Sequence, residues 1–299
     1  MTRWTAEMHD ELRQAWASTK VADLADKFGT SRGAIYVKAN ALGLPARRPR
    51  KEARGGGKQR RFAGYERHDG PRVNLDPWHP AIQEGRTLFG RSVMPAAHAE
   101  RLLKSGEHSR KIGKSGTKGP WKGKPLLTLT LEERATCPRT CLEWATCYGN
   151  NMGHTSIARL VDDGHLQLRL HAELVHHAAL NPQGFVVRLH VLGDFYSVEY
   201  VEFWSRMLDE IEPLQIFGFT ARLPGTEIGD AIVAMMERHD ARAMLRFSGG
   251  GKPLLCSEVV DSLSDAIGIP CPAQHDPDRC CATCALCASS DRTISFLRH

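Results

Sequence analysis

The stretch FVVRLHVLGDF (185–195) decides the fold, because it is a short run of β-branched and aromatic residues that ends near a glycine. Such a run predicts a buried strand. The next stretch, SVEYVEFWSRMLDEI (197–211), has apolar residues at helical spacing and predicts a helix. The pattern then repeats, with a strand over LQIFGFTAR (214–222), a helix over GDAIVAMMERH (229–239) and a strand over AMLRFSGG (243–250).

The same alternation begins further upstream. PLLTLTL (125–131) predicts the first strand, a loop with cysteines follows, and a helix is expected from about Ser156 to Leu180. Alternating strands and helices predict an α/β fold with a parallel sheet, either open and doubly wound or closed into a complete or partial (β/α) barrel. In each of these folds, functional groups collect at the carboxyl ends of the strands.

Polar residues at the ends of three successive predicted strands indicate a pocket. One charged residue there would usually be part of a loop salt bridge, and Asp194 and Arg222 could simply neutralise each other. Polar groups at three successive strand ends favour a functional pocket instead. The candidate catalytic residues are His190, Asp194, Thr220, Arg222, Arg246 and Ser248.

The nine cysteines are clustered, and in a reducing compartment clustering favours metal ligands over disulfides. Cys137, Cys141 and Cys147 directly follow the first predicted strand. Three thiolates so close can hold three irons of a [4Fe–4S] cluster and leave the fourth iron for a substrate or cofactor. They also suit zinc with a fourth ligand, for which His154 is a local candidate.

A second cysteine group lies in CPAQHDPDRCCATCALC (271–287). It combines the C-x2-C-x2-C spacing of a ferredoxin-type cluster with an upstream cysteine followed by proline. The candidate ligands are Cys271, Cys281, Cys284 and Cys287. The same four thiolates would satisfy a structural zinc site, so iron–sulfur and zinc both remain open. Cys280 is expected to be spare, and Cys256 to be a buried small hydrophobe.

Residues 1–45 predict three short helices in a helix-turn-helix plan. Helical spacing of apolar residues indicates helices over 5–17, from Val21 to Phe28 and from Arg32 to Leu42. In this plan the third helix enters the major groove of DNA, although another small three-helix bundle would show the same element order. The residues predicted to contact DNA from this helix are Ser31, Arg32, Tyr36, Lys38 and Asn40.

A charge asymmetry favours a polyanionic partner for the front half of the chain. Residues 1–124 contain 26 Lys and Arg against 12 Asp and Glu, whereas residues 125–299 contain 14 against 22. The segment ARRPRKEARGGGKQRR (46–61) has eight basic residues and one acid. We expect it to follow the phosphate backbone of DNA, with Arg47 and Arg48 among its contacts. Its alternative is a solvated linker.

Several other function classes find no support in the sequence. The N-terminus lacks the layout of a signal peptide, and no apolar run approaches the roughly 18 residues of a membrane span. We therefore expect a cytoplasmic protein with no membrane partner. No kinase or GxGxxG pattern appears, which argues against the usual kinase and dinucleotide-binding classes, and the GxSxG match at 29–33 lies between two predicted helices instead of after a strand, which argues against a hydrolase elbow. The basic, glycine-rich segment 109–124 is only a weak phosphate-binding signal, because it matches no P-loop pattern.

The chain resembles the phage gene-product-88 family over residues 88–299, on LTLTLEERATCPRTCLEWATCYGNNM, RLHVLGDFYSVEYVEFW, GFTAR, RFSG and the cysteine-rich end with ISFLRH. This resemblance implies a phage or prophage origin but no particular reaction. The segments WTAEMHDELRQAW and SRGAIYVKANALGLPARR resemble the GcrA-type helix-turn-helix of alphaproteobacterial regulators, which implies DNA binding. The loop of three cysteines after the first strand resembles radical S-adenosylmethionine enzymes, although their common spacing is C-x3-C-x2-C and the last gap here is five.

Together these features predict three regions: a helix-turn-helix at 1–45, a basic flexible linker at 46–87 and a cysteine-rich, metal-binding α/β domain at 88–299. The leading hypothesis is a DNA-associated protein with one or two [4Fe–4S] clusters, with a radical S-adenosylmethionine enzyme as its catalytic form. The alternatives are a non-catalytic, zinc-stabilised transcriptional regulator and a metal-dependent nuclease. An obvious set of carboxylates for two-metal chemistry is missing from the sequence.

Overall fold

A computed structural model describes residues 4–45, 73–153, 158–249, 255–276 and 278–298, apart from the side chain of Asn40. The chain divides into two compact units, residues 1–69 and 70–299. Each unit is described here by itself. No helix in the described ranges is both long enough and apolar enough to cross a membrane.

The first unit contains the three predicted helices, α1 (Ala6–Ala15), α2 (Val21–Lys27) and α3 (Arg32–Ala41). Thr5 caps α1, because its hydroxyl accepts a hydrogen bond from the Met8 amide at 3.3 Å. The helices enclose a small apolar core that consists of Leu12, Trp16, Leu24, Ala25, Phe28, Ile35 and Ala39. The helical spacing of these residues is what the sequence pattern detects.

The second unit is built on an eight-stranded sheet within the described residues, in the order β2-β3-β5-β6-β7-β8-β10-β9. Its strands are β2 (Lys104–Ser105), β3 (Leu126–Thr128), β5 (Phe185–Leu189), β6 (Leu214–Thr220), β7 (Ala243–Ser248), β8 (Cys256–Val260), β9 (Ile269–Pro270) and β10 (Ile294–Leu297). Among these described strands, β2 alone pairs antiparallel to its neighbour, β3. The strand order rises steadily from β3 to β8, as in the wall of a (β/α) barrel, whereas the order in doubly wound sheets reverses at a switch point.

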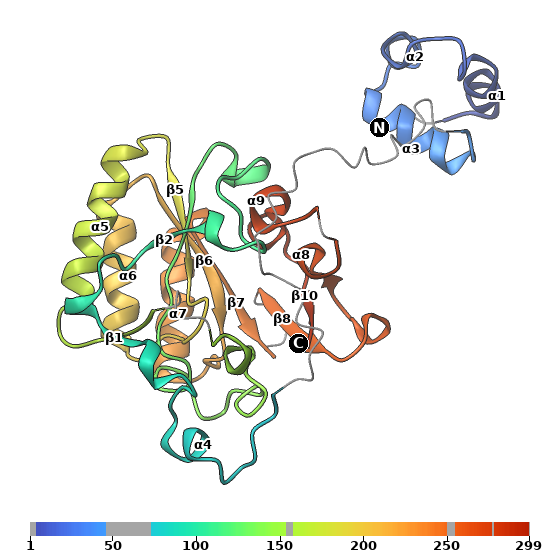
Figure 1. The fold of residues 1–299 in the computed structure, drawn as a ribbon. Helices are drawn as coiled ribbons and strands as arrows, with labels where there is room; N and C mark the ends of the chain where they lie inside the picture. The colour runs from blue at the N-terminus through green and yellow to red at the C-terminus, as the bar shows by residue number, and fades with distance from the viewer. Residues whose placement is uncertain (1–3, 46–72, 154–157, 250–254, 277, 299) are drawn as a thin grey trace. The chain divides into compact units, whose positions relative to one another are not determined.

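One face of the sheet is covered by three helices, α5 (Leu166–Leu180), α6 (Val198–Glu210) and α7 (Glu227–His239), as Figure 1 shows. Alternate strand residues point to this face, including Val187, Leu189, Ile216 and Leu245, all of which are fully buried. Ser197 caps α6 and Thr226 caps α7 through their side-chain oxygens. The predicted α/β class is therefore confirmed.

The opposite face of the sheet is covered by the C-terminal segment. This segment contains three very short helices, α8 (Pro272–His275), α9 (Cys281–Cys284) and α10 (Leu286–Ser289). In Figure 1 the labelled helices α8 and α9 lie on the side of the sheet away from α5, α6 and α7. Val186, Phe217 and Met244 of the sheet form one apolar cluster with residues of this segment and with Trp121. The cysteine-rich end thus packs on a sheet face that would otherwise be exposed.

The structure differs from the predicted elements at several points. A second, two-stranded parallel sheet pairs β1 (Val93–Pro95) with β4 (Arg159–Val161). The strand β4 lies within 156–180, where only a helix was expected. The helix α5 starts later, at Leu166, after Gly164 adopts a φ of 85° that no helix can contain. Ser156, the expected start, lies outside the described residues.

The region predicted as a linker also contains structure. Residues 46–72 lie outside the described part of the chain. Within 73–87, α4 (Pro80–Glu84) is followed by the buried side chain of Thr87. The Leu75 amide donates to the Ala145 carbonyl at 3.2 Å, so this segment packs against the loop that carries the first cysteine group.

Candidate metal centre

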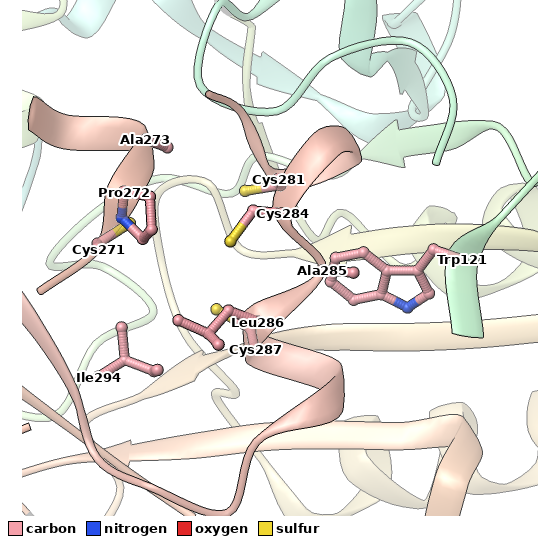
Figure 2. A pocket seen from close by; sticks show the side chains of 10 residues that line it. All are labelled: Trp121, Cys271, Pro272, Ala273, Cys281, Cys284, Ala285, Leu286, Cys287 and Ile294. Atoms are coloured by element: carbon pink, nitrogen blue, oxygen red, sulfur yellow. The ribbon is translucent and has the colours of Figure 1, made fainter. Parts of the chain in front are cut away.

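The four cysteines predicted as ligands near the C-terminus line one small cavity of about 20 Å³. Trp121 and Ile294 close this cavity on two sides. Figure 2 shows the four sulfur atoms turned toward the same space, from the start of α8 and from α9 and α10. The residues that form this group, called the quartet below, are Cys271, Cys281, Cys284 and Cys287.

The quartet sulfurs face one another without reaching ligand geometry. As the described side chains stand, no three His, Cys, Asp or Glu residues are arranged so that they could hold a metal ion. A bound ion would therefore have to draw the sulfurs inward by side-chain rotation. The donor chemistry fits, because four thiolates suit either zinc or an iron–sulfur cluster.

Burial favours the protonated thiols of Cys271, Cys281 and Cys287. Removal from water raises the pKa of Cys281 to about 11 and that of Cys287 to about 12, and it also raises the pKa of Cys271. The nearby guanidinium of Arg188 opposes this rise at all three thiols. Because metal ligands are thiolates, binding an ion here would release protons.

The glycine-rich segment 109–124 packs against the backbone of the quartet segment. The Cys281 amide donates to the Lys111 carbonyl at 2.8 Å, and the Thr117 amide donates to the Ala282 carbonyl at 2.8 Å. Gly113 has a φ of 82°, and a Cβ there would lie 2.7 Å from the sulfur of Cys280. The glycines therefore allow close packing against the cysteine segment, and we assign the loop to this contact instead of phosphate binding.

Arg246, a predicted catalytic residue, holds the C-terminal segment on the sheet. Its fully buried guanidinium donates to the carbonyls of Cys256 at 3.1 Å, Arg292 at 2.8 Å and Cys287 at 3.3 Å, and also to that of Ser290. These contacts account for its two terminal nitrogens, and they assign Arg246 a positioning role. Ser248, another predicted catalytic residue, has its hydroxyl 3.4 Å from the Ser257 hydroxyl of β8.

The second cysteine group lies in the loop after β3 and is called the triad below. It consists of Cys137, Cys141 and Cys147. Burial raises the pKa of Cys147 to about 12, and it also raises the pKa of Cys137 and of Cys141. The carboxylate of Asp194 and, to a smaller extent, Cys141 and Cys147 further raise the pKa of Cys137. His154, the alternative zinc ligand, lies outside the described residues.

Three of the predicted catalytic residues brace the triad loop. The buried carboxylate of Asp194 accepts from the Thr220 hydroxyl at 2.8 Å and from the Ala221 amide at 2.7 Å. Its own backbone amide donates to the Thr136 hydroxyl at 3.1 Å. Arg222 donates to the Thr136 carbonyl at 2.8 Å. This network ties the residue before Cys137 to the ends of β5 and β6.

The electrostatics of Asp194 follow from its burial. Removal from water raises the pKa of this carboxyl to about 6, although three hydrogen bonds and Arg222 work in the other direction. The neighbouring Gly193 has a φ of 86°, and a Cβ there would lie 2.6 Å from the Thr136 hydroxyl oxygen. Only a glycine lets this turn approach the triad loop so closely.

The sequence prediction missed a group of buried charges in the same loop. Glu133 and Arg159 form an ion pair at 2.7 Å, with both side chains almost fully buried. Arg159 also donates to the carbonyls of Gly149 at 3.2 Å and Met152 at 3.0 Å. Arg134 donates to the Trp144 carbonyl at 3.0 Å. The sequence feature that could have revealed these charges is the run Glu132-Glu133-Arg134 directly after an apolar strand, because charged residues are rarely buried.

His190, predicted as catalytic, does not join either cysteine group. It adopts a φ of 54°, and its buried ring packs edge-on against Phe195, with ring centroids 4.6 Å apart. Its Nε2 lies 3.3 Å from the Tyr200 hydroxyl on α6. Burial lowers the pKa of His190 to about 3, so the ring is neutral at physiological pH and fills a packing role.

The predicted strand-end residues therefore separate into distinct groups. Asp194, Thr220 and Arg222 serve the triad loop, Arg246 and Ser248 lie against the C-terminal segment and β8, and His190 packs on α6. None of the six lines the cavity of the quartet.

Comparison with known families gives one match. The model of the family described as gene product 88 matches residues 101–279, which is more than half of the chain. The chain belongs to the gene product 88 family. This confirms the phage family expected from the sequence motifs. The matched segment contains the triad and Cys271 and ends before Cys281. No curated protein and no solved structure matched.

The first unit lies outside the gene product 88 match, so its resemblance to GcrA-type domains stays a prediction. Arg32 is exposed at the start of α3, and half of Tyr36 is exposed. The Ser31 hydroxyl accepts from the Ala34 amide at 3.2 Å, so it is occupied in capping α3. Lys38 lies over the ring of Trp4 at 5.4 Å. The predicted contacts outside the described part are the Asn40 side chain, Arg47 and Arg48.

The buried ion pair of this gene product 88 domain predicts a large stability effect. Replacing Glu133→Gln leaves the guanidinium of Arg159 buried without a counter-charge, and we expect a loss of about 3–5 kcal/mol in unfolding free energy. The measurement is urea-induced unfolding. The control is Asp209→Asn, which breaks a pair with Arg238 at 2.8 Å that is exposed to solvent, and which should cost no more than about 1 kcal/mol. Equal losses in both variants would contradict the role assigned to Glu133.

The lowered pKa of His190 predicts a pH-dependent stability. In the unfolded chain the ring takes up a proton below about pH 6.5, whereas the folded ring stays neutral down to about pH 3. Its contribution to stability is therefore complete above pH 6.5 and is lost as the pH falls. Between about pH 7 and pH 5 the wild type should lose about 2 kcal/mol more than His190→Asn, whose side chain tolerates positive φ. Parallel pH profiles of unfolding free energy would refute this.

Proposed function

We propose that this protein is a DNA-associated metalloprotein whose cysteines bind one or two iron–sulfur clusters. The observation that carries the proposal is the quartet, in which four cysteine sulfurs from three short helical segments face one small cavity. Their C-x2-C-x2-C spacing with a remote Cys-Pro is typical of cluster ligands. A cytoplasmic location, where thiols stay reduced, suits such ligands.

The triad supports a second cluster with a different role. Three cysteine ligands leave one iron of a [4Fe–4S] cluster open, and such a cluster can bind S-adenosylmethionine and supply single electrons. The triad follows β3, the first of the consecutively ordered parallel strands, and the network of Asp194, Thr220 and Arg222 fixes its loop at their carboxyl ends. This arrangement favours a radical S-adenosylmethionine-like enzyme as the catalytic form of the proposal.

A zinc-stabilised regulator is the second candidate, and one observation favours it. The quartet cavity of about 20 Å³ is close to the space of one water-sized sphere, which suits a single ion better than a four-iron cluster. A nuclease is a weaker candidate. The carboxylates beside the triad, Glu132 and Glu133, are already paired with Arg86 and Arg159 at 2.7 Å.

The DNA association of the proposal rests on the first unit. Its three helices, their resemblance to GcrA-type domains and the basic segment 46–61 support contact with DNA. Arg32 and Tyr36 are the exposed α3 residues that we propose as groove contacts. A positively charged segment would add affinity that depends strongly on salt.

Metal content tests the first part of the proposal. Protein purified without oxygen should be brown, contain about four or eight irons per chain and lose its colour with dithionite. Replacing Cys284→Ser should remove about four irons, because it takes one ligand from the quartet. Cys280→Ser is the matched control, because Cys280 neighbours Cys281 but does not line the cavity.

Two outcomes of the metal measurement and one outcome of an assay for S-adenosylmethionine cleavage are decisive. Colourless protein with stoichiometric zinc that Cys284→Ser removes would replace the cluster by the regulator. Equal metal loss in Cys284→Ser and Cys280→Ser would contradict the assignment of ligands. If clusters are present but S-adenosylmethionine is not cleaved under reducing conditions, the radical form of the proposal is wrong.

Binding to a pool of random-sequence DNA duplexes tests the second part, and site selection from the same pool tests groove contact. We expect Arg32→Ala to weaken binding to the selected sequences by roughly 1–3 kcal/mol. Arg13→Ala removes an equal charge from α1, where Arg13 pairs with Asp10, and it should have little effect. Removing residues 46–61 should flatten the salt dependence. Unchanged affinity in both the Arg32 and the deletion variants would reject DNA binding by this unit.

A further inference from the structure

The exposed hydrophobic side chains of the first unit gather on one helix. Among the described residues of this unit, the large hydrophobic side chains that are exposed are those of Tyr36 and Val37, and both belong to α3. Tyr36 is half exposed, and its ring packs edge-on against Trp16 with the ring centroids 5.9 Å apart. Val37 is 71% exposed and lies outside the apolar core of the unit. The packing of the described unit therefore leaves most of the apolar surface of Val37 open to solvent.

Valine is unfavourable at an exposed helix position, because its β-branched side chain loses rotamer freedom there and is a weaker helix former than alanine. The same restriction holds the two methyl groups of Val37 in one orientation, so ordering them against a partner costs little further entropy. One exposed apolar residue is ordinary on a protein surface. The surroundings of Val37 must therefore decide which partner it fits.

The charges of the three helices favour a polyanionic partner for α3. The helix α3 contains two cations, Arg32 and Lys38, and no carboxylate. The carboxylates of the three helices belong to α1 and α2, and they are Glu7, Asp10, Glu11, Asp23 and Asp26. The sequence that follows α3 contains the basic segment 46–61. This segregation of charge is complementary to the phosphates of DNA, whereas a protein partner would not require it.

The geometry of α3 places Val37 beside the residues proposed as groove contacts. Arg32 and Tyr36 are four residues apart, so they form one ridge along the helix. Val37 lies about 100° further around the helix than Tyr36, and the exposed Ala41 continues this second, apolar ridge. Ile35 is fully buried and belongs to the core of the unit. A docking mode that brings Arg32 and Tyr36 to the base edges therefore brings Val37 into the same groove.

The major groove of DNA offers few apolar groups to such a side chain. Among the four bases, thymine presents its C5 methyl group there. We propose that Val37 contacts the C5 methyl group of a thymine and so determines part of the sequence that α3 recognises. This inference rests on the proposed association of the first unit with DNA, and it names one base that the unit reads. Contact between these methyl groups removes apolar surface from water, which stabilises the complex.

Deoxyuridine substitution tests this inference with the full-length chain. The probe is the duplex obtained by site selection from the random pool, with its thymines replaced one at a time by deoxyuridine, which lacks the C5 methyl group. We expect at least one position where this replacement weakens wild-type binding about 4-fold, the effect of burying one methyl-sized group. Val37→Ala should bind the thymine duplex about 4-fold more weakly than wild type and should not respond to deoxyuridine at that position.

The control is Gln14→Ala, which shortens an exposed side chain on α1 and should respond to deoxyuridine as wild type does. Alanine is a better helix former than valine, and Val37 is exposed, so Val37→Ala should fold as wild type does. Thermal unfolding of the variant checks this expectation.

Each outcome has a distinct meaning. If deoxyuridine has no effect at any position, or if it weakens wild type and Val37→Ala equally, the contact between Val37 and thymine is wrong. If Val37→Ala keeps wild-type affinity for the thymine duplex and instead changes the oligomeric state, the exposed face of α3 is a protein interface and the inference is overturned. If the wild-type chain binds no duplex, the proposed DNA association fails first, and the inference fails with it.

Discussion

Both cysteine segments depend on arginine side chains. These arginines donate hydrogen bonds to backbone carbonyls that have no partner in a helix or strand. The triad loop has no long helix or strand, and α8, α9 and α10 have only four residues each, so most of their carbonyls have no partner within the segment. Buried carbonyls must be satisfied. Arg159 and Arg134 do this for the triad loop, and Arg246 does it for the C-terminal segment. These arginines therefore help to fix both groups of sulfurs on the sheet.

The use of buried arginines to bind these carbonyls explains why charged residues lie near the cysteines. Arg159, which binds carbonyls of the triad loop, requires a buried counter-ion, and Glu133 supplies it. Arg246 instead has its hydrogen bonds to backbone carbonyls. Besides burial, nearby carboxylates raise the pKa of the triad thiols, opposed by Arg134 at Cys141 and Cys147, whereas Arg246 and Arg188 lower the pKa of Cys287. The same thiol chemistry thus meets two electrostatic environments in one domain. Such a difference is a means by which a protein gives two centres different affinities and potentials.

Much of the fold could be predicted from the sequence, because its main elements follow local rules. The strand at Phe185, the helix capped by Ser197 and the three N-terminal helices all have clear periodicity or capping signals. Apart from β3, the strands of two or three residues could not be predicted, since they exist only through pairing with distant residues. The strand β4 is an example, because its pairing with β1 spans more than sixty residues.

The candidate site could be predicted only in part, for the same physical reason. Cysteine spacing singled out the four residues that line the cavity. The polar strand ends were correctly seen as unusual, but the sequence does not say whether a polar side chain meets substrate or a carbonyl. Asp194 and Arg246 were predicted as catalytic residues, and the structure shows the loop contacts that they make, which the sequence did not indicate. His190 has a positive φ that directs its ring toward α6, which no sequence pattern indicates.

The central claim, that the quartet sulfurs together bind a metal, is tested most directly by X-ray absorption spectroscopy at the edge of the metal that co-purifies with the chain. The account predicts a first shell of about four sulfur atoms at about 2.3 Å from each metal atom. A first shell dominated by nitrogen and oxygen, or a chain that carries no stoichiometric metal after anaerobic purification, would contradict it.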